Sequence, residues 1–269
     1  MRDRRSFLLL AALVLLPAQA PGAESVQLRY QYRPGEVLNY RLTMESNATF
    51  RMPDGQVEKL NMTNYLELSQ ELIERTPDGN AKVAVTINRV VQRVNGENRR
   101  VPVPEGQVNL LTLMPNGRVV ELQSSAPAAA SQNLQMVFPS KPLRKGDSWE
   151  QTESLTNPLP LETTTEYEVA DLSARFPGYQ GETVYIQSKM SLENSETPTK
   201  EVVQSETKGN LWFDAKNGRI VRSKARSNFS FELPITIPEL VPEGSSVKVN
   251  LDLNVEIALV EVKQTGSND

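Results

Sequence analysis

Three glutamates in the second half of the chain have a spacing that could support hydrolysis. Glu162, Glu166 and Glu168 fall on one face of a predicted strand, and pairs of carboxylates are what most glycosidases use as acid, base or nucleophile. The same alternation places Leu161 and Tyr167 on the opposite face, as in a strand with one solvent-exposed side. We interpret the glutamates as an exposed face and keep a carboxylate-dependent glycoside hydrolase as the less favoured alternative.

A second set of acids lies beside glycines. Asp54, Asp78 and Asp147 each neighbour a glycine in a predicted turn, and carboxylate oxygens in loops can bind calcium. Their spacing matches no calcium-binding loop, whereas aspartates in turns commonly accept hydrogen bonds from their own backbone. We therefore interpret them as turn residues and predict no metal site and no cofactor.

The two tryptophans are the aromatic residues that best suit a binding site. Trp149 enters a predicted strand directly after the turn at Gly146 and Asp147, where an aromatic side chain can line the mouth of a cleft. Trp212 lies in a later predicted strand. We name Asp147, Trp149 and Trp212 as candidate cleft-lining residues, and the alternative is that both tryptophans fill the core. No residue is assigned a catalytic role.

The absence of two residue types excludes most common catalytic chemistry. The chain has no histidine and no cysteine, so it lacks Ser-His-Asp and Cys-His catalytic groups, histidine- and thiolate-bound metals, and disulfides. Only the α-amino group is expected to titrate between about pH 6 and 8. We predict that the protein is not an enzyme and that its stability is flat across this pH interval.

The charge balance argues against nucleic acid as a partner. The chain has 29 basic and 33 acidic residues, which gives a formal net charge of -4. Binding to nucleic acid requires clustered lysine and arginine side chains that neutralise phosphates. The sequence shows no such cluster, and we expect no nucleic acid as a ligand.

Residues 1–20 have the three parts of a secretory signal peptide. Arg4 and Arg5 precede an apolar run from Phe7 to Leu16, and a small-residue cleavage site ending at Ala20 follows. The run is shorter than the roughly 20 apolar residues that a membrane span needs. The arginine pair also resembles a twin-arginine export signal, although the leucine-rich core favours the general secretory route. We expect cleavage after Ala20, a location in the periplasm or outside the cell, and no membrane span.

Apolar residues recur at every second position through most of the chain, which predicts an all-β protein. The longest such run extends from 247 to 259, far beyond the usual strand of about five or six residues. Strands of this length favour a strongly curved antiparallel sheet, either a half-barrel or a barrel-like one. An earlier run places Val83, Val85, Ile87 and Val91 at odd positions, and we expect them to share one face.

Four glycines indicate an internal duplication. Gly35 and Gly146 each come shortly after a basic residue and directly before an acid, and Gly117 and Gly218 each follow an asparagine in a hairpin signal. The offsets are 146 − 35 = 111 and 218 − 117 = 101 residues. We expect the paired glycines to superpose, Gly117 and Gly218 to adopt positive φ, and the arginine after each of these two turns to face water.

The repeat divides the chain into two related β modules. The N-terminal module covers residues 24–124 and the C-terminal module residues 139–263. Residues 125–138 are rich in helix formers and predict a short connecting helix. Three prolines between 231 and 242 indicate an edge or an extended arm, and residues 264–269 are expected to form a disordered tail.

The Pro-x-Lys-Pro-x-x-x-Gly-Asp-Ser-Trp stretch from Pro139 to Trp149 resembles a motif of a family of exported bacterial β-rich proteins, a domain of unknown function. Leu28-Arg29-Tyr30 near the start of the mature chain and the segment from Gly209 to Asp214 are similar as well. The resemblance is loose over most of the chain. It implies an all-β fold and export, and it assigns no activity or site residues.

Two functions fit these observations better than hydrolysis. The favoured one is an exported, non-catalytic β-protein that binds an apolar ligand or a lipid-like group in the cell envelope, because long apolar strands are combined with a lack of catalytic groups. The alternative is a structural or protein-interaction domain of the envelope that binds through sheet edges or the proline-rich segment. The expected partners are therefore a lipid or an envelope protein.

Overall fold

The computed structural model describes residues 24–101, 105–123, 136–155, 161–194, 202–234 and 246–265. Residues 1–20 of the predicted signal peptide, residues 235–242 of the proline-rich segment and residues 266–269 of the tail lie outside these ranges. Most of the predicted connecting helix also lies outside them, and its described residues, 136–138, are not helical.

The described residues form strands and no helix, which confirms the all-β prediction. Every strand pairs with its neighbours in antiparallel orientation within one sheet of 12 strands. The strands are β1 (Glu36–Arg51), β2 (Val57–Arg75), β3 (Ala81–Val94), β4 (Glu97–Arg99), β5 (Val108–Leu113), β6 (Val119–Gln123), β7 (Ser148–Leu155), β8 (Leu161–Arg175), β9 (Glu182–Asn194), β10 (Val202–Asp214), β11 (Arg219–Pro234) and β12 (Ser246–Gln264).

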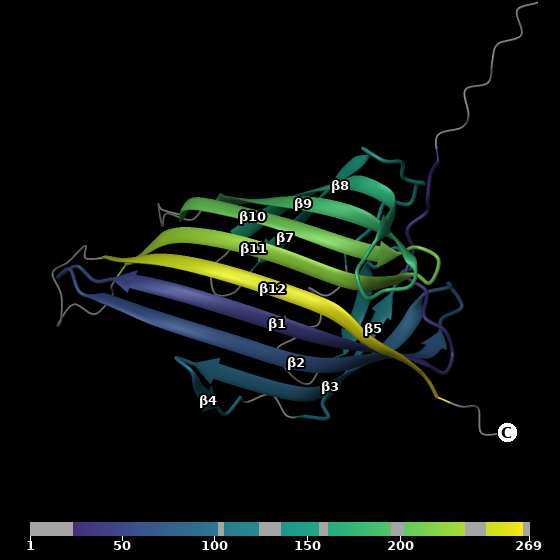
Figure 1. The fold of residues 1–269 in the computed structure, drawn as a ribbon, viewed down its shortest axis with the longest axis horizontal. Coiled ribbons are helices and arrows are strands. Elements are labelled where there is room, and N and C mark those ends of the chain that lie inside the picture. The colour runs from purple at the N-terminus through teal and green to yellow at the C-terminus, as the bar shows by residue number, and fades with distance from the viewer. Residues whose placement is uncertain are drawn as a thin grey trace, which may run out of the picture.

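The sheet is long, curved and open. Its order is β6-β5-β3-β2-β1-β12-β11-β10-β9-β8-β7, with β4 paired only to β3. Leu111 of β5 and Val169 of β8 belong to one buried cluster although many strands separate them in the sheet, so the sheet must curl around a shared interior. Figure 1 shows this curl, with β12, β1 and β11 in front and β5 and β7 behind. We call the result a half-barrel, as the strand lengths predicted.

The two halves of the chain meet where β12 pairs with β1. Within each half, consecutive strands are neighbours in the sheet: β1-β2-β3-β5-β6 and β7-β8-β9-β10-β11. Gly35 and Gly146 precede the first strand of their halves, and Gly117 and Gly218 lie between the last two strands named. This order is compatible with duplication. The division into two modules stays a prediction, because all strands share one sheet and one core.

The core fills one end of the half-barrel. Its largest fully buried side chains are Phe138, Phe213, Leu28, Leu111, Leu113, Leu143 and Ile186. Some of these side chains come from two segments outside the strands. Residues 26–33 precede β1, and residues 136–143 precede β7. Val26 and Leu143 join the two segments by exchanging backbone hydrogen bonds of 2.8 Å in both directions.

Each of these segments is also held by a hairpin from the other half. The backbone N–H of Gln31 donates to the carbonyl of Gly218 (2.9 Å), and that of Phe138 donates to the carbonyl of Asn116 (2.9 Å). Gly117 and Gly218 have φ of +94° and +65°, which confirms the predicted positive φ. We call this end of the half-barrel, with its two hairpins and two crossing segments, the closed end.

A β-bulge in β3 corrects one prediction about its faces. The register against β2 shifts between Ile87 and Arg89, so the alternation is interrupted there. Val91 consequently lies opposite Tyr65, on the side where the guanidinium of Arg89 stacks over the Tyr65 ring at 5.9 Å. The prediction that Val91 shares a face with Ile87 is wrong.

Candidate apolar binding face

The inner face of the sheet is the side that carries the core. In β1 that side is marked by Leu38 and Tyr40, which are buried in the cluster at the closed end. Alternation along the strand places Leu42 and Met44 on the same side. The inner face therefore continues along the half-barrel, away from the closed end and beyond the core.

Beyond the core, the inner face of β12, β1 and β2 is mostly apolar, with Ser46, Glu58 and Asn64 as polar members. Met44 lies opposite Val255, and Ala48 lies between Leu251 and Leu60. The apolar members that are half-buried and lie outside the core cluster are, from β1, β2 and β12 in turn, Met44, Phe50, Leu60, Met62, Leu66, Leu251, Leu253 and Val255. We call this set the apolar strip.

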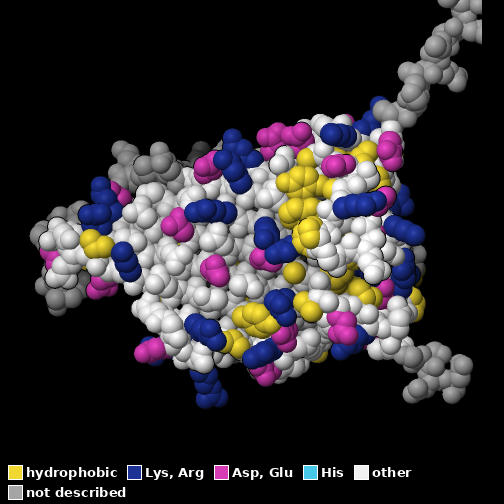
Figure 2. Space-filling view, in the orientation of Figure 1, with side chains coloured by type: hydrophobic (Ala, Val, Ile, Leu, Met, Phe, Trp, Pro, Cys, Tyr) yellow, Lys and Arg dark blue, Asp and Glu magenta, His cyan; other side chains and the backbone are white. Residues whose placement is uncertain are grey.

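The opposite side of the same strands is polar. Lys248, Asn250 and Asp252 alternate with the strip residues of β12 and are exposed, so the face predicted for this strand is confirmed. Figure 2 views the outer face and shows lysine, arginine and acidic side chains scattered over it, with hydrophobic side chains gathered toward the closed end. Extended apolar surface that is only partly buried is typical of interaction sites. The apolar strip is therefore the strongest candidate binding surface.

The closed end itself has little free space. A cavity of about 10 Å³ lies among Tyr30, Tyr32, Tyr40 and Arg219, which is roughly the volume that one water molecule requires. The tyrosine and phenylalanine rings pack closely there: Tyr30 lies 5.3 Å from Phe138. A bulky ligand therefore has no room at the closed end and would have to contact the apolar strip.

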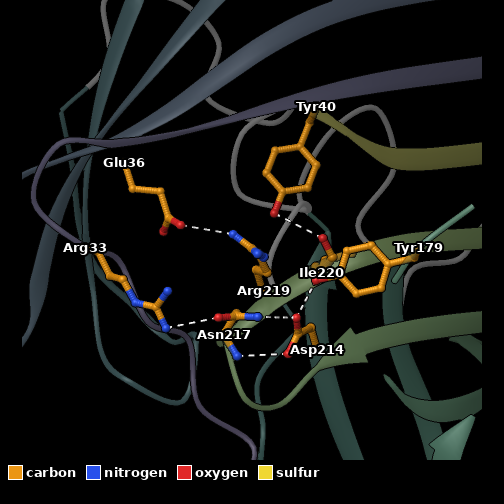
Figure 3. A network of polar contacts seen from close by, with 8 residues as sticks. All are labelled: Arg33, Glu36, Tyr40, Tyr179, Asp214, Asn217, Arg219 and Ile220. Atoms are coloured by element: carbon orange, nitrogen blue, oxygen red, sulfur yellow. Dashed lines mark hydrogen bonds and ion pairs between the residues drawn. The ribbon is translucent and has the colours of Figure 1, made fainter. Parts of the chain in front are cut away.

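A buried ion pair at the closed end connects the two halves of the sheet (Figure 3). Nη1 of Arg219 at the start of β11 lies 3.0 Å from Oε1 of Glu36 at the start of β1, and the two side chains are 12% and 3% exposed. β12 separates β1 from β11 in the sheet, so the pair spans a strand. The Nε of Arg219 is buried and has no hydrogen-bond partner among the described residues.

Beside this pair, Asp214 accepts hydrogen bonds from several groups. Asn217 donates from its backbone N–H (2.9 Å) and from its side chain (2.7 Å), and the Tyr179 hydroxyl donates a short hydrogen bond. Arg33 in turn donates to the Asn217 side chain at 3.1 Å. Burial opposes ionisation, but the hydrogen bonds from Tyr179 and Asn217 outweigh it and hold the pKa of Asp214 below its ordinary value.

Three tyrosines at the closed end resist ionisation. Burial raises the pKa of Tyr30 and of Tyr40 well above the ordinary value, since the charged phenolate would lose its hydration. Burial, together with the hydrogen bond to Asp214, also raises the pKa of Tyr179. The closed end thus keeps its tyrosines neutral and its aspartate charged.

These shifts predict how stability depends on pH. Asp214 has a lowered pKa in the folded state, so its contribution is present above the unfolded pKa of about 3.9 and is lost as the pH falls below it. The tyrosines have raised pKa values, so their contribution is present below about pH 10 and is lost above it. Melting temperature measured from pH 3 to 11 should be flat between about pH 6 and 8 and fall on both sides.

Two variants test the two limbs of this profile. Tyr40→Phe should weaken the loss at alkaline pH and leave the acid limb unaltered. Asp214→Asn should weaken the loss at acid pH, and it should also change the alkaline limb because Asp214 raises the pKa of Tyr179. A melting temperature that changes between pH 6 and 8 would contradict the assignment of both limbs.

Comparison with known proteins identifies a similar fold but no related sequence family. No protein-family model matches the sequence, and no match to a curated protein is significant. The fold is similar to that of lipovitellin. The solved structure described as "lipid-protein interactions in lipovitellin" aligns with a TM-score of 0.55 and 12% identity, over 89% of this chain and 26% of that chain. This chain thus spans about a quarter of the lipovitellin chain, and at this identity the likeness concerns the fold alone.

A second structure, DynF from the dynemicin biosynthesis pathway of Micromonospora chersina, aligns over 93% of this chain and 92% of that chain. Its TM-score is 0.20 at 9% identity. So low a score supports no inference about fold or function.

The structure places the candidate cleft-lining residues in three different settings. Asp147 accepts a hydrogen bond from the backbone of Arg144 (2.9 Å) in an exposed turn. Trp149 is half-buried on the inner face, where it donates to the carbonyl of Val137 (3.1 Å) and packs at the edge of the core. Trp212 lies on the outer face, stacked on Tyr185 at 5.1 Å. The three residues do not form one site.

The acidic residues considered for catalysis or calcium lie where the simpler interpretations put them. Glu166 and Glu168 are exposed, and the side chain of Glu162 lies outside the described part. Asp54 accepts a hydrogen bond from the backbone of Gln56 (2.9 Å), and Asp78 lies in the turn between β2 and β3. Among the described residues, no group of three acids is placed to hold a metal ion.

Sequence reasoning missed the buried pair Glu36–Arg219. The arginines after both asparagine-glycine turns were expected to face water, and Arg118 is exposed as predicted. Arg219 is instead largely buried against Glu36, so that prediction is wrong for this residue. No local signal in the sequence identifies this pair, because 183 residues separate its two members. Among the described residues, no helix is long and apolar enough to cross a membrane.

Proposed function

We propose that this protein binds a lipid-like apolar ligand on the apolar strip and has no catalytic activity. The observation that carries the proposal is the half-burial of Met44, Leu60, Met62, Leu251 and Leu253 beyond the packed core. The likeness of fold to lipovitellin, whose structure is described by its lipid–protein interactions, supports it. A lipid chain laid along the inner face would remove both its own surface and the strip from water.

The expected driving force is hydrophobic and sufficient for specific binding. Each methylene buried contributes about 0.8 kcal/mol, so an acyl chain of ordinary length offsets the loss of translational and rotational freedom, about 4 to 15 kcal/mol. Along each long strand the inner-face positions recur at every second residue, about 6.6 Å apart at a rise of about 3.3 Å per residue. An extended chain therefore suits the strip better than a compact ring system.

A charge placed on the strip should abolish binding without unfolding the protein. Leu253→Lys puts an ammonium group on the half-buried inner face, and its desolvation would oppose an apolar ligand. We expect the affinity for diphenylhexatriene, a fluorescent hydrocarbon, to fall by about tenfold or more, which corresponds to about 1.4 kcal/mol. Fluorescence titration of the wild type and the variant measures the change.

The neighbouring residue provides the matched control. Asp252→Lys introduces the same side chain at the adjacent, exposed position of β12 on the outer face, and it should leave the affinity unchanged. Equal affinities of the two lysine variants would sink the assignment of the inner face as the binding surface. Melting temperatures of both variants show whether each remains folded.

The compartment belongs to the same proposal. Export to the periplasm or beyond follows from the signal-peptide pattern in residues 1–20, and the motif from Pro139 to Trp149 supports a place among exported bacterial β-rich proteins. In that compartment the ligand would be a lipid or a lipid-modified group of the envelope. Edman sequencing of the secreted protein should begin at Pro21, and a start at Met1 would argue against export by this signal.

One observation favours the alternative, a protein-interaction domain. The described sheet ends at β6 and β7, and neither pairs with a further described strand. Open edges of this kind can accept a strand from a partner. Chemical crosslinking in the producing cells distinguishes the two functions, because an envelope protein captured through β6 or β7 supports this alternative and leaves the apolar strip unexplained.

A further inference from the structure

The inner face has two walls of different chemistry. The apolar strip covers β12, β1 and β2, whereas the inner face of β8 to β11 carries hydroxyl groups among its apolar residues, which we call the hydroxyl wall. The hydroxyl-bearing residues are Thr163, Thr165, Ser188, Ser205, Thr207, Ser223 and Ser227. One row crosses the boundary between them: Leu253 of β12 lies opposite Ser227 of β11, which lies opposite Thr207 of β10. The row continues through Met190 of β9 to Thr165 of β8. The hydroxyl wall therefore adjoins the strip directly.

Thr207 is the residue of this wall that lacks a hydrogen-bond partner. Its side chain is 8% exposed, and its Oγ1 is buried without a partner among the described residues. Ser227 beside it is also buried, at 6% exposure. A buried hydroxyl without a partner costs free energy, and native structures retain few of them. A ligand group that bonds Thr207 would recover that cost.

The surroundings of Thr207 select the kind of ligand group. The described inner-face positions of β8 to β11 include no aspartate, glutamate, lysine or arginine. These positions are every second residue from Thr163 to Val169, Ile186 to Met190, Ser205 to Leu211 and Ser223 to Phe231. A phosphate or carboxylate would find no counter-charge there and would lose its hydration. An uncharged acceptor, such as an ester carbonyl, suits a threonine hydroxyl donor.

We infer that the ligand is a neutral acyl ester, whose chain lies on the apolar strip and whose ester oxygen accepts a hydrogen bond from Thr207. The inference rests on the proposed lipid binding and specifies the class of lipid. Because the ester lies next to Ser227 and the chain next to Leu253, one molecule can satisfy both walls at once. Thr207 would thus distinguish esters from plain hydrocarbons.

The test compares two ligands of equal chain length. The glycerol monoester of myristic acid and tetradecane each displace diphenylhexatriene from the wild type and from Thr207→Val, a variant that keeps the side-chain shape and removes the hydroxyl. The variant should bind the monoester about 3- to 10-fold more weakly, the effect of one hydrogen bond, and bind tetradecane with unchanged affinity. Thr164→Val, on the outer face of β8 next to Thr152, should alter neither affinity.

Thermal unfolding adds a signature that a merely structural threonine would not give. Removing a buried hydroxyl without a partner should raise the melting temperature of the ligand-free protein by about 2 to 4 °C. A lower melting temperature would show that Thr207 has a structural partner and would overturn the inference. Equal effects on both ligands, or no effect on the monoester, would overturn it while lipid binding stands. Failure of the wild type to bind either ligand would overturn both.

Discussion

Replacing Gly218 by alanine is expected to destabilise the protein by about 3 kcal/mol or more, from left-handed strain and overpacking together. Gly218 has a φ of +65°, and an added Cβ would lie 2.6 Å from the carbonyl oxygen of Arg29 and closer still to the backbone nitrogen of Gln31. Both atoms belong to backbone that crosses the closed end, so neither can move aside without breaking the hydrogen bond from Gln31 to Gly218. Chemical denaturation measures the loss.

A second glycine separates the two causes. Gly79 also has a positive φ, +81°, but an added Cβ there would meet nothing within 4 Å. Gly79→Ala should therefore cost only the backbone strain, about 1 to 2 kcal/mol. Equal destabilisation by the two substitutions would mean that the crossing segment does not pack against the turn as described.

Replacing Arg219 by methionine is expected to cost about 3 to 5 kcal/mol, because it leaves the charge of Glu36 buried without a partner. The Glu36 side chain is 3% exposed and Arg219 is its ion-pair partner at 3.0 Å. The pair spans β12 and joins the first strand of the chain to β11. The melting transition of the variant should shift to lower temperature and lower denaturant concentration.

The double variant Glu36→Leu with Arg219→Met provides the control. Removing both charges removes the unpaired group, so most of the lost stability should return. If the double variant is as unstable as Arg219→Met alone, the loss would stem from the packing of the arginine stem, and the buried charge of Glu36 would not be its cause.

The alternation of apolar and polar residues in the sequence predicted the β-sheet and the two faces of β12 correctly. The run from 247 to 259 reads as one apolar and one polar side, and the structure places these sides on the inner and outer faces of β12. Such a prediction succeeds because the period of two is a property of every strand. It fails locally at a bulge, because Val91 changes face after the shift at Ile87.

The candidate site was harder to predict because it depends on pairs distant in sequence. Trp149 and Trp212 look alike as strand residues, but register places one on the inner face and the other on the outer face. Arg118 and Arg219 follow similar turns, yet only Arg219 meets an acid, Glu36, which is 183 residues away. The lone hydroxyl of Thr207 has no local signal at all, since its burial depends on the curl of the whole sheet.

Native mass spectrometry of the protein purified from the cells that produce it tests lipid binding most directly. The wild type should carry a bound species whose mass and fragmentation correspond to a lipid, released by organic solvent, and Leu253→Lys purified in the same way should lack it. Asp252→Lys should retain the species as the wild type does. A wild type that emerges at the mass of the bare chain, and that takes up no lipid when incubated with an extract of the producing cells' membranes, would contradict the proposed function.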